Sequence, residues 1–241
     1  ITLDNLNHYL SASNDPIGFI TSLTKPVIID EIQKLPELLR VIKEDIDNAR
    51  ENGQYVLAGS SNIMTFGKIG DTLAGCIAIF ELFPLSAVEL EDSRTNLIDL
   101  LLDGDSFDTK SRDELGILEA IMKGGYPELQ KITDKDNRSI WLSSYIATYI
   151  ERDVRDIGEI RDLDAFRRVI ALIAPLSGSI INSTDISKIA RVNQKTLENH
   201  LSLLKAIYQI TELKPYFKNI QKQSIKSPKI YMNDSAVLCH L

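Results

Sequence analysis

The first ninety residues alternate between two kinds of hydrophobic pattern. Residues 4–23 have the spacing of two short helices separated at Asp15-Pro16, and residues 35–53 form an amphipathic helical pattern. Short apolar runs rich in β-branched residues predict strands at residues 27–30, 54–61 and 77–82. Strands that alternate with helices are typical of a parallel α/β sheet. Because residues 27–30 are apolar throughout, we expect this strand to be covered on both faces.

From Glu89 to about Asp164 the pattern is helical. Two amphipathic segments come first, and Gly124-Gly125-Tyr126-Pro127 ends the second of them. Residues 137–160 then predict one long helix, with a polar end that mixes both signs of charge. We interpret this region as a helical connector.

The last eighty residues have a third pattern. It predicts helices at residues 164–178, 182–192 and 193–210, and strands at residues 211–219 and 228–234 joined by a basic loop. Ser183 or Thr184 is expected to cap the second helix. Three helices followed by a β-hairpin is the layout of a winged-helix domain. The predicted fold is therefore α/β, with a parallel sheet in residues 1–90, a helical connector in 91–160 and a winged helix in 161–241.

Length and composition set broad limits on what the chain does. Its 241 residues, 44% of them hydrophobic, are enough for two domains. Cys76 and Cys239 lie far apart and match no metal-binding spacing, which favours a reducing, cytoplasmic setting. No apolar run approaches the roughly 20 residues of a membrane span, and no signal peptide is visible, so we expect no membrane partner. Since the sequence begins at Ile1 in mid-pattern, we expect it to be a piece of a longer protein.

The net charge of −7 is unevenly distributed. Residues 1–160 hold 15 Lys+Arg and 28 Asp+Glu, whereas residues 161–241 hold 12 Lys+Arg and 6 Asp+Glu. Such asymmetry indicates different partners for the two parts. The acidic first part is a poor surface for nucleic acid, whereas the basic last part suits it.

Two adjacent carboxylates, Asp30 and Glu31, end the first predicted strand. In open α/β sheets the carboxyl ends of the strands face the ligand crevice. A carboxylate there can hold Mg²⁺, and a second one beside it can orient or deprotonate an attacking water. Acidic residues are also common wherever a strand returns to solvent, so a structural interpretation stays open.

The second predicted strand ends in the small polar residues Ser60, Ser61 and Asn62. If the sheet is parallel, they lie at the same edge as Asp30. A side chain there can contact a γ-phosphate or the attacking water. The alternative is an ordinary polar turn. The two features together, at neighbouring strand ends, favour a nucleotide site.

A set of motifs in fixed order resembles bacterial and archaeal AAA-type ATP-binding proteins that carry a C-terminal domain of unknown function. The motifs cover essentially the whole chain: "VIIDEIQKLPELL", "YVLAGSSN", "TLAGCIAIFELFPLSAVEL", "GGYPE", "YIATYIERDVRDI" and "PKIYMND". The resemblance implies a P-loop ATPase sheet that binds ATP and Mg²⁺. It also implies that Asp30 holds Mg²⁺, that Glu31 directs the water, and that Ser60, Ser61 or Asn62 senses phosphate.

The chain departs from that family in three places. It contains no GxxxxGK[ST] loop to hold phosphates, and we expect that loop to lie upstream of Ile1. Family members usually read "LAGR" where this chain has "LAGC" at residues 73–76, so Cys76 cannot supply the positive charge of an arginine. Members often continue past "YMND" into a nuclease-like segment, whereas this chain stops at Leu241. We therefore expect weak nucleotide binding and no DNA cleavage by this piece alone.

Arg152 and Arg155 stand three residues apart on the predicted long helix. They suit contact with a nucleotide in the same or a neighbouring subunit. The alternative, which we favour, is a salt-bridged helix end with Glu151, Asp153 and Asp156 as partners. AAA-type proteins often form rings, so a homo-oligomer is compatible with this sequence, but no feature requires one.

The predicted winged helix offers a set of nucleic-acid contacts. Gln194, Lys195, Thr196 and Asn199 open its third helix, where side chains commonly meet bases and phosphates. Lys218, Lys222 and Lys226 lie in or beside the basic loop and suit phosphate contact. Winged helices also serve as protein-docking modules, so DNA and protein both remain candidate partners.

Two classes of function follow from these patterns. The first is an AAA-type ATPase that couples nucleotide state to a winged-helix domain. The second is a non-enzymatic DNA- or protein-binding module carried on a degenerate ATPase scaffold.

Overall fold

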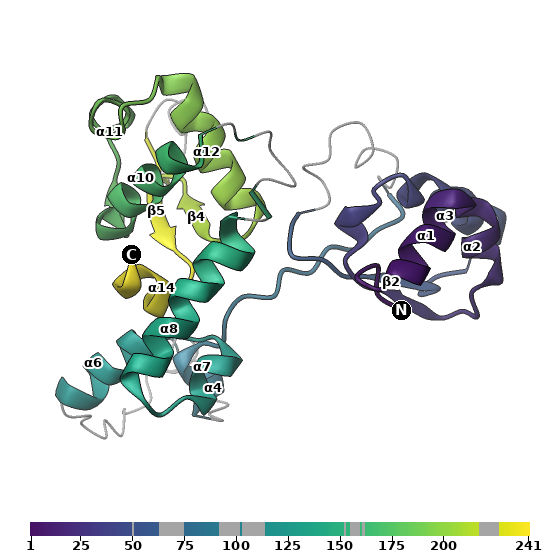
Figure 1. Cartoon of the computed structure of the whole chain (residues 1–241), viewed down its shortest axis with the longest axis horizontal. Helices are drawn as coiled ribbons and strands as arrows, with labels where there is room; N and C mark the ends of the chain where they lie inside the picture. The colour runs from purple at the N-terminus through teal and green to yellow at the C-terminus, as the bar shows by residue number, and fades with distance from the viewer. Residues whose placement is uncertain are drawn as a thin grey trace. The chain divides into compact units, whose positions relative to one another are not determined.

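A computed structural model describes residues 1–49, 51–62, 75–91, 102, 114–151, 153–154, 160, 162–216 and 227–241 (Figure 1). These residues form two compact units, one built from Ile1–Glu81 and Ala206–Tyr208 and the other from Leu82–Lys205 and Gln209–Leu241.

The first unit has helices and short strands in the predicted alternation. Its elements are α1 (Leu6–Asn14), α2 (Pro16–Ser22), β1 (Val27–Ile29), the 3₁₀ turn η1 (Ile32–Lys34), α3 (Leu38–Ala49) and β2 (Tyr55–Leu57). The break at Asp15-Pro16 is confirmed, because the Asp15 side chain caps α2 and Pro16 occupies its first turn. The amphipathic helix is also confirmed, although α3 begins at Leu38, two residues after Pro36.

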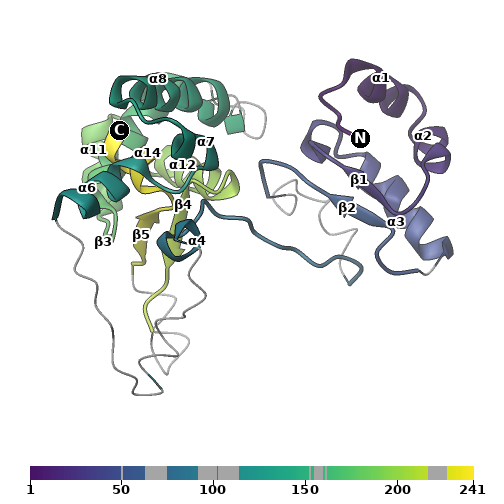
Figure 2. The ribbon, with the colours of Figure 1, turned by 90° about the horizontal axis from the view of Figure 1, so that it is seen from below.

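β1 and β2 pair in parallel, as the pattern predicts (Figure 2). Val27 lies opposite Tyr55, and Ile29 lies opposite Leu57. An isolated parallel bridge joins Thr2 to Asp30 on the other side of β1. The chain that leaves β1 and the chain that leaves β2 therefore emerge at one edge of this small sheet.

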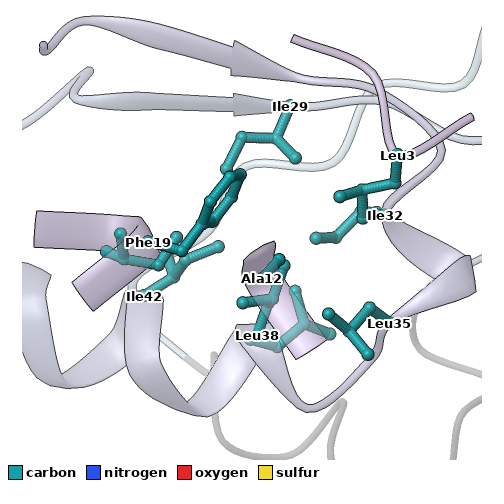
Figure 3. Close-up of a cluster of buried hydrophobic side chains, with 10 residues drawn as sticks. Leu3, Ala12, Phe19, Ile29, Ile32, Leu35, Leu38 and Ile42 are labelled. Atoms are coloured by element: carbon teal, nitrogen blue, oxygen red, sulfur yellow. The ribbon is translucent and has the colours of Figure 1, made fainter. Parts of the chain in front are cut away.

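One face of the β1–β2 sheet covers the core of the first unit. Figure 3 shows Ile29 facing Phe19, Leu38 and Ile42, which come from α2 and α3. The expectation that both faces are covered is wrong for the described structure, because Ile28 is 58% exposed and Val56 is 54% exposed. Helices α1, α2 and α3 all contribute to the single buried cluster, and alternate side chains of each strand point away from it.

The third predicted strand, residues 77–82, is absent from the structure. These residues have no regular secondary structure, and Phe80 and Leu82 are 90% and 97% exposed. A strand needs a hydrogen-bonding neighbour, and among the described residues β2 pairs only with β1. An apolar, β-branched pattern is therefore not sufficient to form a strand here.

A polar cluster fastens α3 to the strands at the edge away from Asp30. Lys25 forms an ion pair with Asp45 of α3, and the Tyr55 hydroxyl donates to the same carboxylate at 2.7 Å. Lys25 also lies over the Tyr55 ring, 5.3 Å from its centroid. These donors lower the pKa of Asp45, Lys25 most of all, so the carboxylate stays charged and the helix is held across both strands.

The second unit is mainly helical and carries a small antiparallel sheet. Its elements are α4 (Ala87–Leu90), α6 (Glu114–Lys123), α7 (Pro127–Lys131), α8 (Lys135–Tyr145), the π-helical turn η4 (Ile146–Ile150), α10 (Leu163–Ile173), the 3₁₀ turn η5 (Ala174–Leu176), β3 (Ser179–Ile180), α11 (Ser183–Ala190), α12 (Gln194–Ala206), β4 (Ile210–Leu213), β5 (Lys229–Met232) and α14 (Ser235–His240). The sheet order is β3-β5-β4, with β5 antiparallel to both neighbours.

The predicted helices of the last eighty residues are present, with one corrected cap. Asn182, not Ser183 or Thr184, caps α11, and its side chain accepts from the backbone N–H groups of Thr184 and Asp185. Three consecutive residues can all serve as caps, so the local pattern did not distinguish them. Phe166 and Val169 of α10 and Leu197 and Leu201 of α12 are buried, as their helical spacing predicts.

Two of the family motifs meet inside the second unit. The buried carboxylate of Asp234, from "YMND", accepts hydrogen bonds from the backbone N–H groups of Gly125 at 2.8 Å, Ala236 at 2.8 Å and Val237 at 3.0 Å. Gly124 has a φ of +64°, and a Cβ there would lie 2.6 Å from Asp234 Oδ1. The "GGYPE" and "YMND" segments therefore contact each other closely although they lie far apart in the sequence.

No helix among the described residues is long and apolar enough to cross a membrane.

Replacing Asp234 by Ala should destabilise the second unit by about 2–4 kcal/mol, because it removes the cap of α14 and leaves the Gly125 N–H buried without an acceptor. Urea unfolding followed by tryptophan fluorescence would measure the change, since Trp141 lies in the same unit. The matched control is Asp136→Ala, an exposed aspartate in the first turn of α8. Equal costs for the two substitutions would contradict the structural role of Asp234.

Candidate functional site

The candidate site lies where the chain leaves β1 and β2. Asp30 and Glu31 follow β1, and Ser60 and Ser61 follow β2 after Ala58-Gly59. Backbone hydrogen bonds continue beyond the strands, from Ala58 N to Ile29 O at 2.9 Å and from Ile32 N to Ala58 O at 3.1 Å. The parallel pairing therefore brings the acid pair and the serine pair to one sheet edge, as the sequence predicted.

The two acids differ in environment. Asp30 is exposed, and among the described residues no hydrogen-bond or ion-pair partner engages its carboxylate. Glu31 is half-buried, in the left-handed conformation with φ 57° and ψ 38°, at the start of η1. Burial raises the pKa of Glu31, and the nearby charges of Asp4 and Asp30 raise it further. A less acidic glutamate is better suited to accept a proton from water than an ordinary surface one.

Gln33 links Glu31 to Ser60. Its side-chain Nε2 donates to Glu31 Oε2 and also to Ser60 Oγ, the latter at 3.0 Å. Gln33 lies inside the motif "VIIDEIQKLPELL" but is not one of the predicted site residues. A glutamine two residues after a glutamate does not by itself indicate a contact between the two side chains. This contact depends on the turn between β1 and η1, and the contact with Ser60 depends on the position of β2.

Two buried polar atoms at this edge have no hydrogen-bond partner among the described residues: Gln33 Oε1 and Ser61 Oγ. Buried polar groups in folded proteins are nearly always paired, so such atoms are suited to water or a polar ligand. Ser60 is half-buried and Asn62 is also half-buried, beside the buried Ser61. The edge thus combines an exposed carboxylate with hydroxyl groups, a set of polar groups that fits hydrated Mg²⁺ and phosphate oxygens.

The site suits a magnesium ion that is bound partly by the protein and partly by a substrate. No group of three or more His, Cys, Asp or Glu side chains that could hold a metal occurs in the described part of the chain. Mg²⁺ commonly takes one or two carboxylates and fills its other positions with water and phosphate oxygens. Asp30 could supply the protein ligand to such an ion, whereas the chain has no GxxxxGK[ST] loop to hold the phosphates themselves.

The predicted arginine contacts lie outside the described residues, because Arg152 and Arg155 are not among them. Their neighbour Glu151 is buried and pairs with Arg167 of α10. Arg167 Nε lies 2.7 Å from Glu151 Oε1, and Nη2 lies 2.8 Å from Oε2. This bidentate pair connects the "YIERDVRDI" motif to α10, which agrees with a structural role for its first acid.

The start of α12 presents most of its predicted contacts to solvent. Gln194, Lys195 and Asn199 are exposed, whereas Thr196 is half-buried. Gln194 Nε2 donates to Thr184 Oγ1 at 3.0 Å, which ties α12 to α11. His200 is buried, edge-on to Phe166, and burial lowers its pKa. Lys218, Lys222 and Lys226 lie outside the described residues.

Comparisons with known families agree with the division seen in the sequence. Residues 115–241 match a family described as a domain of unknown function (DUF8612), and because this match covers more than half of the chain, the chain belongs to that family. Residues 1–91 match the AAA domain family. The resemblance of the first part to AAA-type ATPases is thereby confirmed.

The curated relatives are themselves uncharacterised. The chain is 26% identical over 227 residues to the uncharacterised protein Rv2008c of Mycobacterium tuberculosis and, equally, to Mb2031c of Mycobacterium bovis. The alignment covers 94% of this chain but 46% of each relative, so the chain spans about half of their length. No solved structure matches the chain at a significant level.

Proposed function

We propose that the protein containing this chain binds ATP with Mg²⁺ and hydrolyses it. Asp30 holds the magnesium ion, Glu31 orients and deprotonates the attacking water, and Ser60, Ser61 and Asn62 contact the terminal phosphate or that water. When bound, Mg²⁺ would neutralise charge developing on the phosphate oxygens. The similarity of residues 1–91 to the AAA domain family supports this assignment.

One observation carries the proposal. The parallel pairing of β1 with β2 places an exposed carboxylate, a glutamate of raised pKa and two serines at a single sheet edge. An acidic residue that only returns the chain to solvent needs no contact with the neighbouring strand. Glu31, however, is linked to Ser60 at the end of β2 through the side-chain amide of Gln33. The chemistry expected of this set is in-line attack of water on a phosphoryl group.

Glu31→Gln should lower the rate of ATP hydrolysis at least about 100-fold while leaving Mg·ATP binding nearly unchanged, because the amide cannot accept the proton of the water. Phosphate release and nucleotide binding would be measured on the natural full-length protein. The matched control is Glu37→Gln, an exposed glutamate of the same segment, which should hydrolyse ATP normally. Normal turnover in Glu31→Gln would contradict the assignment of Glu31.

We propose further that residues 161–241 form a winged helix that binds DNA through the start of α12, with residues 91–160 as a connector to the ATPase core of residues 1–90. The order of α10, β3, α11, α12, β4 and β5, and the antiparallel sheet β3-β5-β4, support the winged-helix assignment. The exposed side chains of Gln194, Lys195 and Asn199 favour DNA over packing within the chain. Lys218, Lys222 and Lys226 are the proposed phosphate contacts of the wing.

Lys195→Gln should weaken binding to duplex DNA for all sequences and lower the slope of log K against log salt by about 1, because one phosphate contact is lost. Fluorescence anisotropy at several salt concentrations would measure both. Lys131→Gln, an exposed lysine on α7, is the matched control. Absence of DNA binding by the unsubstituted protein would instead favour a protein-docking role for this domain.

A further inference from the structure

Gln33 occupies a position that the proposed mechanism does not yet use. It lies in η1, between the acid pair and the first turn of α3, and its side chain reaches across to the end of β2. Its amide nitrogen has two N–H groups, and the two atoms that it contacts, Glu31 Oε2 and Ser60 Oγ, can both accept. One side chain thus bridges the carboxylate at the end of β1 and the hydroxyl at the end of β2.

We infer that Gln33 is a positioning residue that orients the Glu31 carboxylate and couples it to Ser60. The inference rests on the proposed ATPase function and deepens it. Glu31 itself has a left-handed backbone conformation, and the donor from Gln33 favours the side-chain rotamer that brings Oε2 within its reach. Misplacing a catalytic group by about 1 Å can cost about 100-fold in rate, so such selection matters for hydrolysis.

The direction of the hydrogen bonds gives Gln33 a second task. Because Gln33 donates to Ser60, the hydroxyl acts as acceptor there and keeps its own proton to donate elsewhere. A phosphate oxygen or a water at the sheet edge is a suitable acceptor for that proton. A hydroxyl that donates its proton becomes a better acceptor, so a ligand that accepts from Ser60 strengthens the Gln33–Ser60 hydrogen bond and holds the amide that also donates to Glu31. Nucleotide binding and Glu31 orientation are thereby linked through one amide.

Gly59 provides independent support for this arrangement. A Cβ at residue 59 would lie 2.2 Å from Gln33 Oε1, far inside van der Waals contact. Its φ is outside the left-handed region, so the backbone itself would accept alanine, and the constraint is the space taken by the Gln33 amide. The chain thus has a small residue where the Gln33 side chain passes β2.

The fold does not depend on the Gln33 side chain. Ile32, its neighbour, is the buried residue of η1, and the backbone bond from Ile32 N to Ala58 O already connects this turn to β2. Gln33 itself is half-buried. Substitution should therefore leave the unit folded and change mainly the orientation of Glu31.

Gln33→Met, which keeps the length of the side chain but removes both donors, should lower kcat for ATP hydrolysis about 10–100-fold and change the Kd of Mg·ATP less than threefold. Gly59→Ala should have a similar effect by displacing the amide. Because both act through Gln33, the double variant should be no slower than Gln33→Met alone, whereas independent effects would multiply. These rates and affinities would be measured on the natural full-length protein.

Gln54→Met, the same chemical change at the other end of β2, is the matched control and should keep the wild-type kcat. Wild-type turnover in Gln33→Met, or a loss in affinity as large as the loss in kcat, would overturn the inference while leaving the ATPase assignment intact. Multiplying effects in the double variant would also overturn it, since Gly59 would then act without Gln33. An unsubstituted protein that neither binds nor hydrolyses ATP would refute the proposed function itself, and this inference with it.

Discussion

The parallel pairing of β1 with β2 is the constraint on which the candidate chemistry of the first unit depends. Three residues of each strand are paired in register. Backbone hydrogen bonds to Gln54 and Ala58 extend this pairing beyond both ends of β2. Residues that follow two parallel strands lie at the same edge of the sheet. Residues that follow two antiparallel strands lie at opposite edges. Asp30, Glu31 and the serines are therefore neighbours although about thirty residues separate them in the chain.

The sheet formed by the described residues of this unit has two strands, and only one of its faces is covered. One face packs on a single cluster with α1, α2 and α3, while Ile28 and Val56 on the other face are more than half exposed. Residues 77–82 have the composition of a buried strand yet find no strand to pair with, so Phe80 and Leu82 remain in solvent.

The sequence predicted those parts of the fold that local pattern determines. β1, β2, the break at Asp15-Pro16 and the helices α10, α11 and α12 follow from apolar spacing and capping residues. Features that depend on distant contacts were not predictable in this way. The partner of Asp234 is Gly125, 109 residues away, and the role of Gln33 appears only once Ser60 and Gly59 lie beside it. The prediction of a strand at residues 77–82 was wrong for the same reason, because a strand forms only where a neighbouring strand can pair with it.

The central claim is that this sheet edge binds ATP through a magnesium ion held by Asp30. Calorimetric titration of ATP into the natural full-length protein, with and without Mg²⁺, tests it most directly when repeated with Asp30→Ala. The account predicts that Mg²⁺ tightens ATP binding in the unsubstituted protein and has little effect on affinity in Asp30→Ala. Absence of ATP binding, or an equal effect of Mg²⁺ in both proteins, would contradict it.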